Sequence, residues 1–166
     1  MVHKNTIKFI LKNGGFEKII RAICFSVNDK IKRGNIDFKK NKLILGKYEF
    51  QTIENDEGIS TELQIYESHE PLTTHLMINE LKQDMICVDL GSNIGYYAVI
   101  ESNLIGETGK IFAIEPSPVN FPVLKSNLEN QKMNNFLAFN IAIGDKNEEM
   151  EFIISSKSNW SKIRMN

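Results

Sequence analysis

The feature that most constrains the fold is a short apolar run that leads into a glycine-containing turn. Residues 85–90 (MICVDL) are continuously apolar except for Asp89, which is typical of a parallel strand buried on both faces. The turn runs from Gly91 to Gly95, and residues 96–104 after it predict a helix. A strand, a tight turn and a helix in this order indicate an α/β domain.

The same alternation continues toward the C-terminus. Lys110–Ile114 predicts a second buried strand, and Val119–Asn130 predicts a second helix. Phe136–Ile143 predicts a third strand, which a Gly-Asp pair ends. Residues 149–155 alternate between polar and apolar and predict one more strand, possibly antiparallel. The alternation of strands and helices predicts a parallel sheet with right-handed crossovers.

The segment before this sheet has a different pattern. Short β-like runs at residues 43–45, 48–53 and 59–66 are separated by turn-forming residues, which predicts a small antiparallel hairpin unit. A helix is expected from about Pro71 to Lys82, with the proline in its first turn. We therefore expect residues 43–166 to form the N-terminal part of one α/β domain.

Residues 1–42 differ from the rest of the chain in charge. They hold eleven Lys/Arg against three Asp/Glu, whereas the remainder holds nine against eighteen. Apolar residues recur at spacings of three and four from Phe16 to Ile31, which predicts an amphipathic helix with a basic face. We expect this helix to pack on the body of the protein, with an anionic membrane surface or a protein partner as alternatives. Nucleic acid is not expected, because interleaved aromatic residues and a reader motif are lacking.

The chain is predicted to be cytoplasmic. Cys24 and Cys87 lie in apolar surroundings without metal-ligand spacing, which indicates free thiols in a reducing compartment and no metal site. No apolar run approaches the roughly 20 residues that span a bilayer. The run Ile19–Val27 is interrupted by Arg21 and has no small-residue cleavage site, so neither a signal peptide nor an anchor is expected.

The turn from Gly91 to Gly95 is where an open α/β sheet binds nucleotides. Its glycines allow close approach to a ligand, and N–H groups at the helix start can hold an anionic group. Asp89 is placed to meet an ammonium group directly or through water. Glu115, at the end of the second strand, is placed to accept both ribose hydroxyls of an adenosine. Asp145 is a candidate acceptor for the adenine amino group, although a Gly-Asp pair also fits an ordinary turn.

The spacing of the glycines distinguishes two classes of nucleotide. The dinucleotide fingerprint G-x-G-x-x-G leaves room for a pyrophosphate, whereas this turn is Gly-Ser-Asn-Ile-Gly with an acid two residues before it. S-Adenosylmethionine has no pyrophosphate, and its ammonium group suits an acid. The turn therefore favours S-adenosylmethionine as the cofactor over the NAD of an oxidoreductase.

Three successive segments then resemble a known family. VDLGSNIGYYAVI, IFAIEPSPVNFPVLKSNLE and FNIAIGDKNEEMEF are similar to the successive motifs of FkbM-type methyltransferases. The resemblance covers about residues 55–160 and includes His69-Glu70-Pro71, with Ser92 in place of a usual alanine. It implies a Rossmann-like methyltransferase fold, a partial parallel sheet with helices on both faces. It also implies a donor-binding set of Asp89, Gly91, Ser92, Asn93, Gly95, Tyr96, Glu115, Pro116 and Asp145.

The resemblance further implies O-methyl transfer to a glycan or another hydroxyl acceptor. Family members continue with a Thr-Leu-Asp segment and an Asp-x-Glu-Gly strand, which this sequence lacks. Relative to the family the chain looks truncated, and we expect it to hold the donor-binding half. A non-catalytic module, or one piece of a split enzyme that needs a partner chain, is the alternative.

Two further expectations concern the edge of the sheet and the catalytic base. Without a fourth strand, residues 85–90 present an apolar edge that self-association, a partner chain or a rearranged local sheet would cover. The sequence identifies no catalytic base. His69 and His75 are more typical of surface or capping positions, whereas Tyr96 and Tyr97 fit either the donor pocket or the core.

Overall fold

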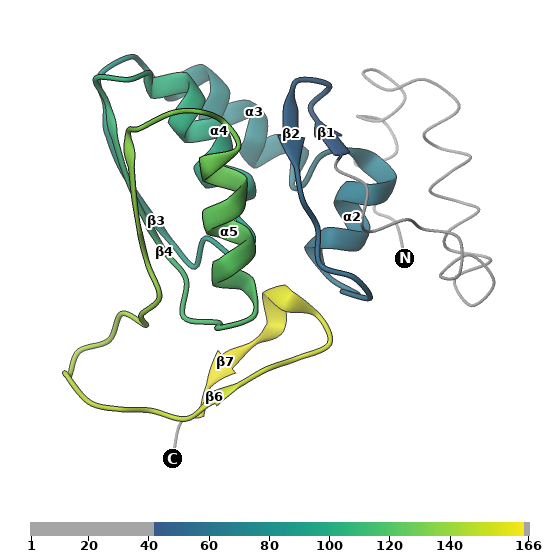
Figure 1. Ribbon diagram of the computed structural model, residues 1–166, viewed down its shortest axis with the longest axis vertical. Coiled ribbons are helices and arrows are strands. Elements are labelled where there is room, and N and C mark those ends of the chain that lie inside the picture. The colour runs from purple at the N-terminus through teal and green to yellow at the C-terminus, as the bar shows by residue number, and fades with distance from the viewer. Residues whose placement is uncertain (1–41, 165–166) are drawn as a thin grey trace.

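The computed structural model describes residues 42–164, which contain a three-stranded parallel sheet (Figure 1). The strands β3 (Ile86–Leu90), β4 (Lys110–Ile114) and β5 (Phe136–Phe139) follow one another in the order β3-β4-β5. Helix α4 (Tyr96–Ile105) connects the first pair of strands and α5 (Asn120–Glu129) connects the second. The predicted Rossmann-like alternation of parallel strands and helices is confirmed.

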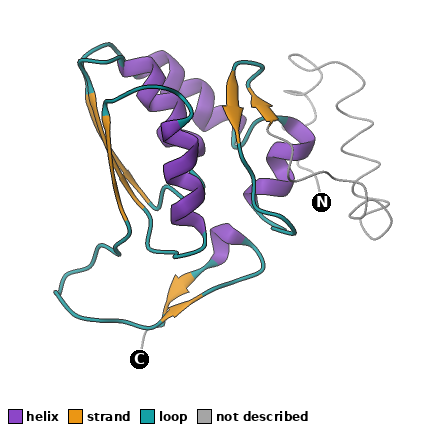
Figure 2. Cartoon of the chain, viewed as in Figure 1, coloured by secondary structure: helices purple, strands orange, loops and turns teal. Residues whose placement is uncertain are grey.

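Both crossover helices lie on the same face of the sheet (Figure 2). Each crossover moves in the same direction across the sheet, and right-handed crossovers then place both helices on one side. Ile111 and Ala113 of β4 are fully buried on this side. The expectation of helices on both faces is therefore corrected for residues 42–164. A helix on the second face requires the strand order to reverse, and these strands do not reverse it.

The second face of the sheet is apolar and exposed. The parallel register aligns Ile86, Val88 and Leu90 with Lys110, Phe112 and Ile114. The exposed side chains that we call the apolar sheet face come from β3 and β5: Ile86, Val88, Leu90, Leu137 and Phe139. Strand β3 pairs only with β4 within the described chain, so its outer edge is open, as the sequence predicts.

A hairpin and two helices precede the sheet. The predicted hairpin is present as β1 (Lys42–Ile44) and β2 (Tyr48–Phe50), and α3 (Pro71–Glu80) begins at the expected proline. The strand predicted at residues 59–66 is wrong, because this segment forms α2 (Ile59–Tyr66). Its buried residues follow helical spacing: Ile59, Ser60, Leu63 and Gln64.

One hydrophobic core joins this N-terminal unit to the sheet. Ile44 and Phe50 of the hairpin, Leu63 of α2 and Leu124 of α5 are fully buried in the same cluster. Ile94, in the turn after β3, is buried in that cluster as well. The turn after β3 therefore packs against the hydrophobic core through Ile94.

The C-terminal part differs from the prediction in two respects. Strand β5 ends at Phe139 instead of Ile143, and residues 140–151 have no regular secondary structure. The strand predicted at residues 149–155 is present only as β6 (Phe152–Ile153). It pairs antiparallel with β7 (Lys162–Ile163), after the short 3₁₀ helix η2 (Ser158–Trp160), and does not join the main sheet.

Several predictions fall outside the described residues. They are the amphipathic helix at residues 16–31, the basic arm that contains it, and the state of Cys24. Cys87 of β3 is a half-buried free thiol. No helix between residues 42 and 164 has the length and apolarity needed to cross a membrane. The cytoplasmic location, and the contact of the arm with a membrane or protein, stay predictions.

Candidate functional site

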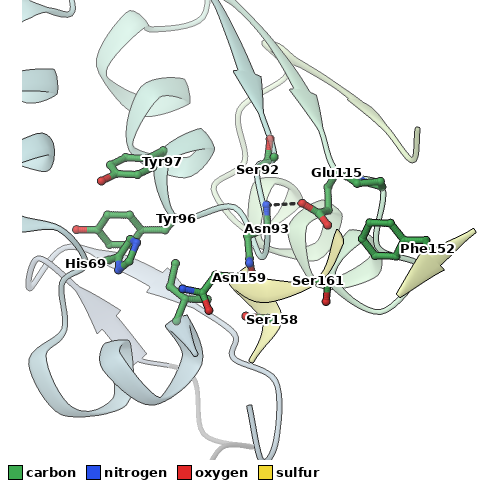
Figure 3. A pocket seen from close by; sticks show the side chains of 13 residues that line it. His69, Ser92, Asn93, Tyr96, Tyr97, Glu115, Phe152, Ser158, Asn159 and Ser161 are labelled. Atoms are coloured by element: carbon green, nitrogen blue, oxygen red, sulfur yellow. Dashed lines mark hydrogen bonds between the residues drawn. The ribbon is translucent and has the colours of Figure 1, made fainter. Parts of the chain in front are cut away.

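A pocket of about 230 Å³ opens beside the carboxyl ends of β3 and β4 (Figure 3). Its walls come from the turn after β3, the end of β4, the segment before α3 and the C-terminal hairpin. The residues of the predicted donor-binding set that line it are Gly91, Ser92, Asn93, Tyr96, Glu115 and Pro116. Asp89, Gly95 and Asp145 do not line it.

The turn after β3 is closed by its own hydrogen bonds. The amides of Gly91 and Ser92 donate to the Ile114 carbonyl at 2.8 and 3.0 Å, and the Gly95 amide donates to the Ser92 carbonyl at 2.8 Å. Gly91 has a φ of +78° and open space where a side chain would lie, whereas a Cβ on Gly95 would lie 2.8 Å from Leu124 Cδ1. Gly91 therefore leaves the backbone accessible, and Gly95 lets α5 pack against the turn.

The other amides of this turn also have partners. The Asn93 amide donates to Glu115 Oε2 at 2.8 Å, and the Ile94 amide donates to Asn93 Oδ1 at 2.8 Å. Residues 91–95 therefore offer a ligand no free N–H group. An anionic group would depend on the first turn of α4, where N–H groups have no partner within the helix.

Glu115 is buried at the end of β4, and both of its carboxylate oxygens accept hydrogen bonds. Oε2 accepts from the Asn93 amide across the pocket floor (Figure 3), and Oε1 accepts from the Ser117 amide at 2.9 Å and from Asn120 Nδ2 at 3.3 Å. A carboxylate has about four lone-pair positions, so these three donors leave capacity for a ligand hydroxyl. The same donors hold the carboxylate in a single orientation.

Asp89 lies next to the turn but outside the pocket wall. Its Oδ2 is buried and has no hydrogen-bond partner among the described residues. Burial raises the pKa of Asp89, a hydrogen bond with Ser92 lowers it, and the charge of Glu115 raises it. Ser92 Oγ donates to the Asp89 carbonyl at 3.0 Å and accepts from the Ile114 amide at 3.1 Å, so it joins the ends of β3 and β4.

Asp145 is not brought to the site. It is exposed within residues 140–151, because β5 ends at Phe139 and the chain then leaves the edge of the sheet. Asn140 takes the place next to the end of β4 instead. Its Nδ2 donates to the carbonyls of Glu115 and Pro116 at 2.8 and 3.1 Å.

His69 and two tyrosines form the end of the pocket away from Glu115 (Figure 3). His69 Nδ1 lies 2.6 Å from Glu62 Oε2, and its ring lies edge-on to Tyr96 with centroids 5.7 Å apart. Tyr97 Oη donates to Glu70 Oε2 at 2.9 Å. Burial raises the pKa of both tyrosines, and Glu70 adds to this rise, so both phenols stay protonated at neutral pH.

The C-terminal hairpin supplies a wall that the sequence analysis did not identify. Its lining residues are Phe152, Ser158, Asn159 and Ser161. The buried Asp56 holds it in place, because Asp56 accepts from the Ser158 amide at 2.8 Å and from Ser158 Oγ at 2.9 Å. The same carboxylate accepts from the amides of Gly58 and Ser60 at the start of α2.

Asn127 of α5 is a second residue whose role was not predicted. It is fully buried, and its Nδ2 donates to the carbonyls of Ile94 and Gln51 at 2.8 and 3.0 Å. Its Oδ1 accepts from the Gln51 amide at 2.7 Å. Asn127 therefore fixes the turn after β3 to the segment after β2. The only signal in the sequence is its place in the Leu-x-x-Asn end of the family resemblance.

Comparison with known proteins gives one family and several partial structural likenesses. Residues 89–166 match the methyltransferase FkbM domain family. No curated protein matches the chain.

The structural likenesses are to methyltransferases. A protein-L-isoaspartate O-methyltransferase is 26% identical, with a TM-score of 0.40 over 43% of this chain and 23% of that one. A SAM-dependent O-methyltransferase from Thermotoga maritima is 19% identical, with a TM-score of 0.43 over 50% and 32%. A SAM-dependent methyltransferase from Aquifex aeolicus is 19% identical, with a TM-score of 0.38 over 50% and 43%. The chain spans less than half the length of each of these structures.

Proposed function

We propose that the chain, whose residues 89–166 match the methyltransferase FkbM domain family, binds S-adenosylmethionine in the pocket beside β3 and β4. We further propose that it supports methyl transfer to a hydroxyl oxygen, on a glycan or another polyhydroxyl acceptor. The observation that carries the proposal is the buried Glu115 carboxylate, held across the pocket floor from the glycine turn.

The residues around the pocket fit the parts of this donor. Glu115 has capacity for a ribose hydroxyl, whereas Asp89 lies outside the pocket wall and is assigned no part of the donor. Pro116 and Phe152 line the pocket on the Glu115 side, as Figure 3 shows for Phe152, and offer apolar surface to adenine. The first turn of α4 is suited to a carboxylate. When bound, the donor supplies an electrophilic methyl group on a sulfonium.

The contribution of this chain is to bind the methyl donor and to orient it. The hydrogen bonds within the turn and around Glu115 fix the shape of the pocket floor. Positioning supplies much of the rate in a displacement of this kind. The same closed turn argues against a dinucleotide, because residues 91–95 have no free amide for a pyrophosphate.

A second candidate is a donor-binding module that needs a partner chain for turnover. The open edge of β3 and the apolar sheet face favour it, since both are surfaces that further protein normally covers. The two candidates share the donor site and differ in whether the chain alone transfers the methyl group.

Calorimetric titration with S-adenosylhomocysteine tests the donor site, and NAD serves as the control ligand. We expect saturable binding of S-adenosylhomocysteine alone. Glu115→Ala should weaken it by about tenfold or more, because hydrogen bonds to a charged group contribute ~1.5–3 kcal/mol. The matched control is Glu129→Ala, an exposed acid on α5 that should bind like the parent. A folded sample that binds neither ligand, or that binds NAD, would refute the proposal.

A further inference from the structure

The pocket contains few groups that are able to take a proton from an acceptor. Its titratable lining residues are His69, Tyr96, Tyr97 and Glu115. A base must lose its own proton near neutral pH, and both tyrosines are kept as phenols by burial and by Glu70. Glu115 already accepts from three N–H donors, which occupy most of its lone-pair positions. Only His69 in this lining remains available for the task.

The surroundings of His69 prepare one of its ring nitrogens for that role. Nδ1 lies 2.6 Å from Glu62 Oε2, which favours the tautomer with its proton on Nδ1. Nε2 then carries the lone pair, and it makes no hydrogen bond to the described residues. The His69 side chain is only 14% exposed, and Thr74 Oγ1 donates to its carbonyl at 2.7 Å. The contact of Nδ1 with Glu62 therefore orients the ring.

The charged and titratable groups that face this imidazole are carboxylates and phenols. They are Glu62 from α2, Glu70 before α3, 3.8 Å from Nε2 through Oε1, and Tyr96 and Tyr97 from α4. The two carboxylates lie 2.6 and 3.8 Å from the ring nitrogens of His69. They repel an anionic acceptor, so this end of the pocket suits a neutral hydroxyl compound.

We propose that His69 is the general base for the acceptor hydroxyl and that Glu62 is its positioning residue, an inference that rests on the proposed function. The acceptor O–H bond breaks and its proton moves to Nε2 of His69. The oxygen forms a bond to the methyl carbon as the carbon–sulfur bond breaks, and that electron pair stays on sulfur. The products are a methyl ether, S-adenosylhomocysteine and an imidazolium, which releases its proton to water.

Nitrogen NMR of the imidazole rings tests the positioning role without turnover. Multiple-bond ¹H–¹⁵N spectra of the full chain should show His69 with its proton on Nδ1, assigned by its loss in His69→Gln. Glu62→Gln should mix the two tautomers of His69. His75→Gln is the control, because His75 of α3 contacts Asn79 and lies outside the pocket lining. A proton on Nε2 in the parent, or a spectrum unchanged by Glu62→Gln, would overturn the inference.

The pH dependence of transfer to methyl β-D-glucopyranoside, used as a hydroxyl probe, tests the catalytic role. The parent rate should rise with pH, as general-base catalysis requires, and His69→Gln should be about 100-fold slower or more, without this rise. Its affinity for S-adenosylhomocysteine should stay within about twofold of the parent, because His69 and Glu115 lie at different ends of the pocket.

The outcomes of this second experiment distinguish a failure of the His69 assignment from a failure of the proposed function. A His69→Gln chain that keeps the parent rate overturns the base and leaves the proposed function intact. A parallel loss of S-adenosylhomocysteine affinity makes His69 a donor-binding residue and overturns its assignment as the base. If the parent binds S-adenosylhomocysteine and transfers no methyl group, the proposal that the chain alone is catalytic is overturned. The assignment of His69 as the general base is overturned with it. If S-adenosylhomocysteine does not bind, the donor site itself fails.

Discussion

At the scale of single residues, two acids near the glycine turn, Asp89 and Glu101, are unusual because each has a buried carboxylate oxygen without a hydrogen-bond partner among the described residues. Glu101 of α4 has a buried Oε2 without a partner among the described residues. Burial, followed by the charge of Asp89, raises the pKa of Glu101 to about 7. Asp89 has a similarly unpartnered Oδ2. The ionised form of Glu101 therefore opposes folding, and its amide analogue should not.

We predict that Glu101→Gln is more stable than the parent above pH 7. The folded-state pKa lies above the ordinary 4.5, so the parent is most stable below that value and loses stability as the pH rises through about 7. The gain at pH 8 should be about 1–2 kcal/mol, less than the full shift implies because the side chain is partly solvated. Urea denaturation at pH 4 and pH 8 measures this difference in the free energy of unfolding. Glu107→Gln is the control, because Glu107 is exposed. Equal stabilities at pH 8 would contradict it.

Single residues also show where sequence reasoning succeeds and where it stops. Glu115 could be predicted, because the end of a parallel strand after a glycine turn is a position set by local pattern. Asp56 could not be, because its partner Ser158 lies 102 residues away. Asn127 bonds to Gln51 across 76 residues for the same reason. Such hydrogen bonds depend on how the elements pack, which no local pattern contains.

At the scale of elements, the hairpin of β6 and β7 completes the pocket without belonging to the sheet. The sequence pattern suggested a longer strand at residues 149–155, since alternation alone does not say whether a neighbouring strand is present to pair with it. Residues 59–66 show a related ambiguity, because Ile59, Leu63 and Ile65 fit both a strand and a helix. The segment forms a helix, and Asp56 accepts from the Ser60 amide in the first turn of α2, which begins at Ile59.

We predict that Asp56→Ala releases this hairpin. The change leaves the amides of Gly58, Ser60 and Ser158 without their acceptor, at a cost of about 3 kcal/mol or more. Hydrogen exchange should quicken at residues 152–161, and S-adenosylhomocysteine should bind at least tenfold more weakly. Asp145→Ala is the control and should change neither property, because Asp145 is exposed and outside the pocket. Unchanged exchange in Asp56→Ala would refute this role of Asp56.

At the scale of the whole molecule, the residues from 42 to 164 cover only one side of the sheet. The apolar sheet face includes Ile86, which is 73% exposed, and the open edge of β3 borders it. Exposed apolar surfaces of this kind mark sites of association. On the face that carries Ile86, Val88 and Leu90, Lys110 is the one charged residue in the paired register of β3, β4 and β5, so little charge opposes the approach of a second copy.

We therefore predict that the purified chain self-associates through the apolar sheet face. Sedimentation velocity over a concentration series should show dimers or larger species, which Ile86→Lys should shift toward monomer. Leu72→Lys is a matched control, because Leu72 of α3 is 72% exposed and lies away from the sheet. A parent that stays monomeric at every concentration, or an equal effect of both lysines, would contradict the prediction.

The central claim, that this chain builds a donor pocket from the glycine turn and Glu115, is tested most directly by mapping S-adenosylhomocysteine on the ¹H–¹⁵N spectrum. The account predicts that the largest shifts occur at Gly91, Asn93 and Ser117, whose amides border or bind the Glu115 carboxylate. The amide of Phe152 should shift as well, while those of the apolar sheet face should move little. Shifts confined to other surfaces, or none at saturating ligand, would contradict the account.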